Sequence, residues 1–133
     1  MAGTLTIGTL SDGTYSVAST YCIFGSAKAW VNFVVSTSAS QTINASFNVS
    51  SVTYVTGSQL TVNFVNGFTD ANYLVLGATT QSNINSYNYA SQIRDDGIRR
   101  TKTTSASPIC YYDTVNGQAI PATAINGAVA FFR

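Results

Sequence analysis

The sequence contains no histidine and no glutamate, and both absences restrict the chemistry it can perform. Without histidine, a Ser-His-Asp or Cys-His nucleophile and a histidine-ligated metal are excluded. The five acidic residues are all aspartates, so a pair of catalytic glutamates is excluded as well. Asp95 and Asp96 are the only adjacent carboxylates, and neighbouring side chains on a strand point to opposite faces, which favours a charged turn over catalysis. We therefore expect a protein that is not an enzyme, with no catalytic residue, no metal site and no cofactor.

Charged residues are also scarce: they make up 8% of the chain, and the formal net charge is +1. A charge this small attracts neither nucleic acid nor an anionic membrane surface over a distance. No apolar run approaches the roughly 20 residues that a membrane-spanning helix needs. The chain instead has 16 serines, 18 threonines and 11 asparagines, whose hydroxyl and amide groups supply a polar surface. We expect no nucleic-acid partner and no membrane insertion.

The two cysteines, Cys22 and Cys110, lie far apart in the sequence and form no CxxC motif, so they do not indicate a metal knuckle. The first residues have neither a basic start nor a long apolar stretch, so we expect no secretory signal and synthesis in the cytosol. A cytosolic origin favours two reduced, buried thiols. A long-range disulfide is the alternative, and the sequence alone leaves it open.

Twelve valines and nine isoleucines against five leucines indicate strands rather than helices, because β-branched side chains suit a pleated sheet. Residues 42–50 alternate between polar and apolar, which predicts one half-buried strand. Tyr73–Ala78 and Ala128–Phe132 contain few polar residues, which predicts strands that are buried more fully. The other predicted strands are Thr4–Leu10, Tyr15–Tyr21, Ala29–Val35, Ser51–Val55, Leu60–Phe64, Ile98–Thr104 and Ile109–Asp113.

Five of the ten glycines directly follow asparagine or aspartate, a pairing that is typical of type I′ turns between antiparallel strands. These glycines are Gly13, Gly67, Gly97, Gly117 and Gly127. They predict an antiparallel meander. With 133 residues, the chain has the size of one domain. We therefore predict an all-β fold, an antiparallel β-sandwich or barrel-like single domain over residues 1–133.

The segment from Gln81 to Arg100 differs from the rest of the chain, because it gathers three of the four arginines and two of the five aspartates. A connection of this length in a compact β domain is often functional, so we interpret it as a variable, exposed excursion. Its tyrosine rings and neighbouring amides suit a sugar face or a protein partner; the alternative is that the rings pack inside the domain or between subunits. The candidate receptor-binding or partner-binding residues are Tyr87, Asn88, Tyr89, Arg94, Asp95, Arg99 and Arg100.

Several short motifs follow one another along the chain. They are AWVNF at 29–33, NASFNVSSV at 44–52, LTVNF at 60–64, TDANY at 69–73 and FFR at 131–133. In these motifs the sequence resembles a domain that is common at the C-termini of bacteriophage tail-fibre and related virion proteins. The resemblance extends from residue 29 to residue 78 and includes the C-terminal residues.

The resemblance implies a small β-sandwich-like or barrel-like module that forms a homotrimer on the exterior of a virion assembled in the host cytoplasm. It implies a tail-fibre or tail-tip component whose partners are other virion proteins and a host-surface glycan or protein. Residues 1–28 are interpreted as an anchoring or attachment segment. The alternative is a capsid decoration or cement protein that does not contact the host. Burial between subunits would also account for an apolar fraction of 45% in so lightly charged a chain.

Overall fold

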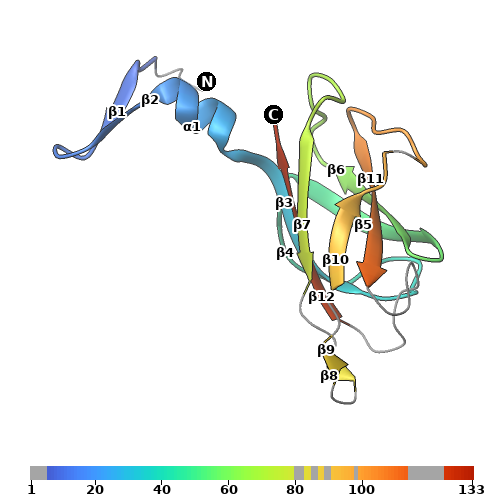
Figure 1. Ribbon diagram of the computed structural model, residues 1–133. Coiled ribbons are helices and arrows are strands. Elements are labelled where there is room, and N and C mark those ends of the chain that lie inside the picture. The colour runs from blue at the N-terminus through green and yellow to red at the C-terminus, as the bar shows by residue number, and fades with distance from the viewer. Residues whose placement is uncertain (1–5, 80–82, 85–86, 89–90, 98, 114–124) are drawn as a thin grey trace.

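The computed structural model describes residues 6–79, 83–84, 87–88, 91–97, 99–113 and 125–133 (Figure 1). The strands in these ranges are β1 (Thr9–Ser11), β2 (Ser16–Ala18), β3 (Ala27–Val35), β4 (Ile43–Phe47), β5 (Val49–Thr56), β6 (Gln59–Phe64), β7 (Leu74–Thr79), β8 (Asn83–Ile84), β9 (Tyr87–Asn88), β10 (Ser91–Asp95), β11 (Ala106–Asp113) and β12 (Ile125–Phe132). In the same ranges there is one helix, α1 (Ser19–Gly25). The prediction of an all-β fold is confirmed.

Two antiparallel four-stranded sheets make up the body of the protein. One has the strand order β10-β11-β6-β5 and the other has the order β4-β3-β12-β7. Figure 1 shows the two sheets packed face to face as a β-sandwich. The prediction of a meander is wrong, because β12 pairs with β3 and β7, and β11 pairs with β6. Asn-Gly and Asp-Gly pairs indicate local chain reversals, and they carry no information on which distant strands pair.

The core between the sheets is built from the inward-facing side chains of alternating strand residues. At one end of the core, the ring of Phe131 packs edge to face against Phe64 at 5.0 Å and against Tyr73 at 5.9 Å between centroids. Burying one large side chain of this kind contributes about 1.5–3 kcal/mol to stability. Among the described side chains, the buried core begins at Ala29 and includes none from residues 6–26. The sandwich therefore has a complete hydrophobic core of its own.

Two glycines allow the sheets to come together where β7 lies against β10. A Cβ atom at Gly77 would lie 2.5 Å from the carbonyl oxygen of Ile93, so only glycine permits this approach. A Cβ atom at Gly127 would lie 2.6 Å from the Ile93 Cδ1 atom and 2.9 Å from the Val35 Cγ2 atom. The turn predicted at Asn126-Gly127 is wrong, because Gly127 lies inside β12 and makes room for core side chains.

The predicted turn at Asp12-Gly13 is confirmed: it joins β1 to β2, and Gly13 has a φ angle of +95°. Gly67 and Gly97 lie in longer loops rather than in tight hairpins. Gly117 lies outside the described residues. The tight turn between β5 and β6 contains Gly57, which has a φ angle of 57°. This glycine follows Thr56, so the search for glycines after asparagine or aspartate did not find the turn.

The strand predicted over residues 42–50 is divided in the structure, because the chain passes from one sheet to the other at Asn48. Asn48 has a φ angle of 55°, which asparagine tolerates better than most residues do. Its side chain fixes this crossing: Nδ2 donates to the carbonyl oxygens of Lys28 and Asn66, and Oδ1 accepts from the Asn66 amide. The alternation of polar and apolar residues therefore continues across Asn48, although the chain changes sheets there, so the pattern predicted one strand instead of two.

The first described residues form an extension that we call the N-terminal arm, residues 6–26, which contains the β1–β2 hairpin and α1. Figure 1 shows the arm projecting from the sandwich at the start of β3. The strand predicted over Tyr15–Tyr21 is wrong beyond Ala18, where α1 begins. A helix satisfies the backbone groups of this segment locally, by hydrogen bonds within the segment.

The arm also carries Cys22, which is an exposed free thiol, whereas Cys110 in β11 is a buried free thiol. The prediction that both cysteines are buried is therefore wrong for Cys22. Across the described residues, no helix has the length and apolar character required to cross a membrane.

Candidate functional site

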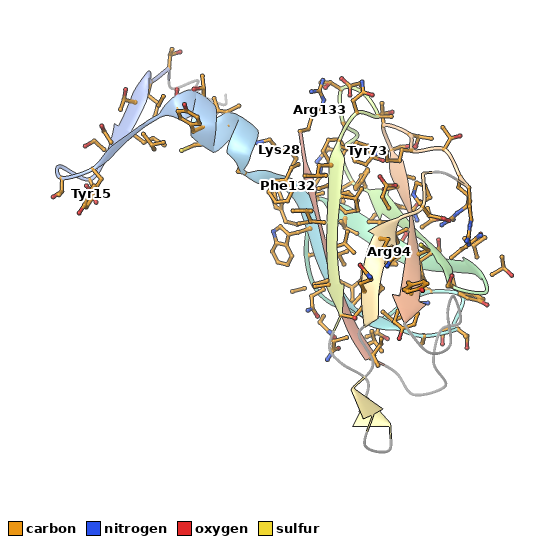
Figure 2. The ribbon with its side chains drawn as sticks, viewed as in Figure 1. Tyr15, Lys28, Tyr73, Arg94, Phe132 and Arg133 are labelled. Atoms are coloured by element: carbon orange, nitrogen blue, oxygen red, sulfur yellow. The ribbon has the colours of Figure 1, made fainter. Side chains whose placement is uncertain are left out.

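Three of the predicted site residues lie at the end of β10 and in the loop that follows it. Arg94 is exposed, and its guanidinium carbon lies 4.2 Å from the centre of the Tyr112 ring (Figure 2). The Asp95 carboxylate accepts a hydrogen bond of 2.9 Å from the Lys102 ammonium. Arg99 is exposed in the loop. Arg94 and Arg99 thus remain available to a partner, while Asp95 is engaged with a neighbouring cation.

Arg100 serves the fold. Its Nε donates to the Asp96 carboxylate at 3.1 Å, and the Asp96 side chain is only 4% exposed. The other guanidinium nitrogens donate to the Thr61 hydroxyl and to the carbonyl oxygens of Leu60 and Ile109. Five-donor arginine is suited to joining several acceptors in this way. These donors are used inside the protein, so the described contacts of Arg100 are with its own chain, and its predicted binding role stays a prediction.

These contacts also explain why the strand predicted over Ile98–Thr104 is wrong in the described part, residues 99–104. The loop is folded by local bonds, in which the backbone amides of Arg99 and Arg100 donate to the Asp96 carbonyl oxygen and the Thr103 hydroxyl accepts from the Ala106 amide. The interpretation of residues 81–100 as one exposed excursion holds only in part, since Ser91–Asp95 form β10 and Ile93 is buried in the core.

The tyrosine-containing part of the candidate site lies in a small hairpin. Tyr87 and Asn88 form β9, which pairs with β8. Their side chains, and Tyr89 as a whole, lie outside the described part of the chain. Figure 1 shows the β8–β9 hairpin at the end of the sandwich away from the arm. The structure therefore places the β8–β9 hairpin away from the arm, and the predicted role of Tyr87, Asn88 and Tyr89 lies outside what the described residues test.

An uncovered apolar surface lies on the outer face of the β4-β3-β12-β7 sheet. Register places four side chains in one row across this sheet: Trp30 pairs with Phe47 and with Ala130, and Ala130 pairs with Leu76. Phe47 is 55% exposed, Leu76 53% and Trp30 40%. We define the apolar sheet face by its outward-facing residues Trp30, Phe47, Leu74, Leu76, Ala78, Ala128, Ala130 and Phe132.

The apolar sheet face contains a shallow groove of about 290 Å³, lined by residues of β3, β7 and β12. Asparagines border the face at one end, where Asn44 donates to the side-chain oxygens of Asn32 at 2.8 Å and Asn126 at 3.3 Å. Lys28 and Phe132 mark the other end, on the side from which the arm leaves (Figure 2). The face is thus apolar over its centre and carries no charged side chain there, which suits a protein surface better than a sugar.

The N-terminal arm is a second apolar surface. Its large exposed side chains are Ile7, Leu10, Tyr15, Val17, Tyr21 and Ile23. A groove of about 380 Å³ lies between the hairpin and α1, and Leu10, Cys22 and Ile23 are among its lining residues. Within the arm, the only charged side chain is that of Asp12, at the tip of the hairpin. An exposed apolar surface of this kind marks an interaction site.

The direction of the arm is set at its junction with β3. The Lys28 ammonium donates to the Ile23 carbonyl oxygen at the C-terminal end of α1 and to the Ser26 hydroxyl at 2.7 Å. A cation at this end of a helix also interacts favourably with the helix dipole. Lys28 therefore ties α1 to the first residues of β3, and the arm leaves the sandwich in a defined direction.

The titratable groups of the described residues give no sign of a reactive centre. Burial raises the pKa of the Cys110 thiol and of the Tyr73 hydroxyl, which keeps both in the neutral form. The Tyr73 hydroxyl shares its proton with the carbonyl oxygens of Thr103 and Ala106, both at 3.0 Å. Among the described residues, no three metal-ligating side chains come together. The arrangement offers contact surfaces for binding and assembly.

Both apolar surfaces were missed by the sequence analysis, although a signal was present. The strands around Leu74 and Ala128 read as almost continuously apolar, which was interpreted as burial on both faces. In the isolated chain only their inner faces are buried. The apolar residues on the outer side were therefore the signal for an exposed apolar face. Comparisons of the chain with protein-family models, with curated proteins and with solved structures found no match.

Proposed function

We propose that this protein is a structural component of a bacteriophage virion, part of a tail fibre or tail tip, which assembles as a homotrimer and presents a host-surface-binding module. The resemblance of its short motifs to tail-fibre modules supports the virion role. The β-sandwich supports a rigid scaffold that displays loops. The protein acts by binding and is not an enzyme.

One observation supports the proposal: the uncovered apolar surfaces and the β8–β9 hairpin lie in different places. The apolar sheet face and the arm are suited to assembly with virion proteins. The β8–β9 hairpin lies at the end away from the arm (Figure 1). A tail component needs this division, because one part of its surface must attach to the virion while another remains free to contact the host.

Adhesion by such a module needs no reactive group. Each copy contributes weak contacts through exposed residues such as Arg94 and Arg99, together with Tyr87 and Tyr89. Display of several linked copies raises the effective concentration of the second and third contacts, so overall avidity exceeds the affinity of one copy by about 10²–10⁴. The receptor class we propose is a host-surface glycan or protein.

The test is made on particles and on host cells. Antibody against the protein is expected to label the tail in electron micrographs of phage particles that contain it. Purified protein is expected to bind host cells, and the triple variant Tyr87→Ala, Tyr89→Ala, Arg94→Ala is expected to lose at least about tenfold in binding. The control is Val65→Ala, an exposed position away from the β8–β9 hairpin. Undiminished binding by the triple variant would contradict the proposed receptor site, and new reducing ends on host polysaccharide would contradict the non-enzymatic role.

A capsid decoration or cement protein is the second candidate. The arm favours it, because an extended apolar segment is suited to holding neighbouring capsid subunits together. The same imaging experiment separates the two functions. Label distributed over the head instead of the tail would establish the decoration role and remove the need for any host contact.

A further inference from the structure

We propose that the apolar sheet face of one copy of this chain binds the N-terminal arm of a second copy. The two surfaces would be those through which copies of the chain assemble. Only the location of this assembly in a virion rests on the proposed function.

The arm has the features of a segment that is completed by a partner. An isolated two-stranded hairpin is marginally stable in water, and a helix of seven residues is too short to be stable on its own. None of the arm's described side chains belongs to the core of the sandwich, and the described large apolar side chains of both the hairpin and α1 are exposed. The hairpin and helix therefore need another apolar surface to cover them.

The apolar sheet face is a surface of matching chemistry. Antiparallel sheets that face water on one side normally carry polar residues there, but this sheet carries Trp30, Phe47 and Leu76 in one row. The centre of the face has no charge, and the arm has only Asp12 at its tip. Neither surface would therefore bury an unpaired charge when the two come together. About 20 residues of arm also match one side of an interface of ordinary size.

The junction of the arm favours a second copy as the source of the bound arm. Lys28 ties the end of α1 to the start of β3, and Figure 1 shows the arm directed away from its own sandwich. Its own sheet face is thus left open beside the junction, where Figure 2 places Lys28 and Phe132. Each copy supplies one arm and one face, so a closed ring of copies covers every arm and every face.

The experiment uses one charge substitution on each surface. Leu10→Asp places a charge among the apolar residues of the arm, and Leu76→Asp places one in the apolar sheet face. Val65→Asp is the matched control, since Val65 is 63% exposed and belongs to neither surface. Circular dichroism establishes that each variant retains its sheet structure. If either principal variant fails to fold, Ile23→Asp or Leu74→Asp replaces it on the same surface.

Light scattering at micromolar concentration gives the mass of each species. The native chain and Val65→Asp are expected to be oligomeric, whereas Leu10→Asp and Leu76→Asp each raise the dissociation constant about tenfold or more. An equal mixture of the two variants is expected to regain association, because the Leu76→Asp chain retains an intact arm and the Leu10→Asp chain retains an intact face. A monomeric native chain, a native mass in either variant, or a monomeric mixture would overturn the inference.

Cross-linking identifies which chain supplies the arm. A chain with Leu76→Cys and Cys22→Ser is mixed with a heavier, tagged native chain, whose exposed Cys22 lies in the arm. A short bismaleimide reagent is expected to join the two chains, and Val65→Cys with Cys22→Ser is expected to give no such product. A chain that carries Cys22 and Leu76→Cys and links only to itself would show that the arm folds back, which refutes the inference. These measurements use purified protein and do not depend on where the protein lies in a particle. Failure of the contact between copies is therefore seen separately from failure of the virion role, which particle labelling tests.

Discussion

Arg100 illustrates how single residues fix the loop between β10 and β11. Its guanidinium joins the buried Asp96 carboxylate to acceptors on β6 and β11, so the loop is held against two neighbouring strands. Arg99, its neighbour in sequence, is exposed. Two adjacent arginines therefore have different roles, because only one of them reaches acceptors that are removed from water.

We predict that Arg100→Met lowers the free energy of unfolding by about 3 kcal/mol, because it leaves the Asp96 carboxylate buried without its cation. Arg99→Met is the matched control, and we expect it to change stability by less than about 0.5 kcal/mol. Urea denaturation followed by tyrosine and tryptophan fluorescence measures both values. Equal effects in the two variants would show that the contacts of Arg100 do not stabilise the loop.

At the scale of elements, the sequence identified segments well when one strand face was buried and the other was polar. Leu60, Val62 and Phe64 alternate with polar residues, and β6 was predicted to within one residue. Strand pairing was not predictable in the same way. The pairing of β12 with β3 depends on contacts between residues about a hundred positions apart, and no local pattern encodes them.

Three local signals were misinterpreted because their meaning depends on tertiary context. Gly127 follows an asparagine, but it lies inside β12, where the absence of a side chain leaves room for the Ile93 side chain. Asn48 continues an alternating pattern while the chain changes sheets. α1 has no strong helical signal, since no capping side chain bonds to its first turn. The receptor-binding role of the predicted site stays a prediction. The sequence did not predict that Arg100 bonds to Asp96, Thr61, Leu60 and Ile109, because these contacts depend on how distant segments come together.

The turn between β1 and β2 provides a prediction on pH dependence. The Asp12 carboxylate accepts hydrogen bonds from the backbone amides of Tyr15 at 2.7 Å and Thr14 at 2.9 Å, which lower the pKa of Asp12 below its ordinary value. A carboxylate whose folded pKa is lowered stabilises the turn above the ordinary aspartate pKa. That stabilisation is lost as the pH falls through the lowered folded value.

We therefore expect the amide proton resonances of Thr14 and Tyr15 to shift together in an acid titration by nuclear magnetic resonance, with a midpoint below that of aspartate in an unstructured peptide. Asp12→Ala is expected to remove the titration and to loosen the hairpin at every pH. Amide resonances in β6, which has no carboxylate, serve as the reference within the same sample. A midpoint at or above the peptide value would contradict the assigned hydrogen bonds.

The whole molecule combines a sandwich with a complete core and an arm without one. The described side chains between the two sheets are buried within one chain. In the proposed assembly, the arm and the apolar sheet face become buried when two copies associate. Folding and assembly are thus linked by mass action, because a partner that binds only the folded chain stabilises it in proportion to the logarithm of its concentration.

This linkage predicts that the melting temperature of the native chain depends on protein concentration. Tenfold dilution removes about 1.4 kcal/mol of association free energy for each interface, which lowers the melting temperature by about 5 °C in a chain of this size. Leu76→Asp is expected to melt at a lower temperature than the native chain at each concentration, because its sheet face binds an arm about tenfold or more weakly, while Val65→Asp follows the native chain. Scanning calorimetry over a hundredfold range of concentration makes the measurement. A native melting temperature that is unchanged over that range would mean that the sandwich folds and melts alone, and the exposed row of Trp30, Phe47 and Leu76 would then require a partner other than a second copy.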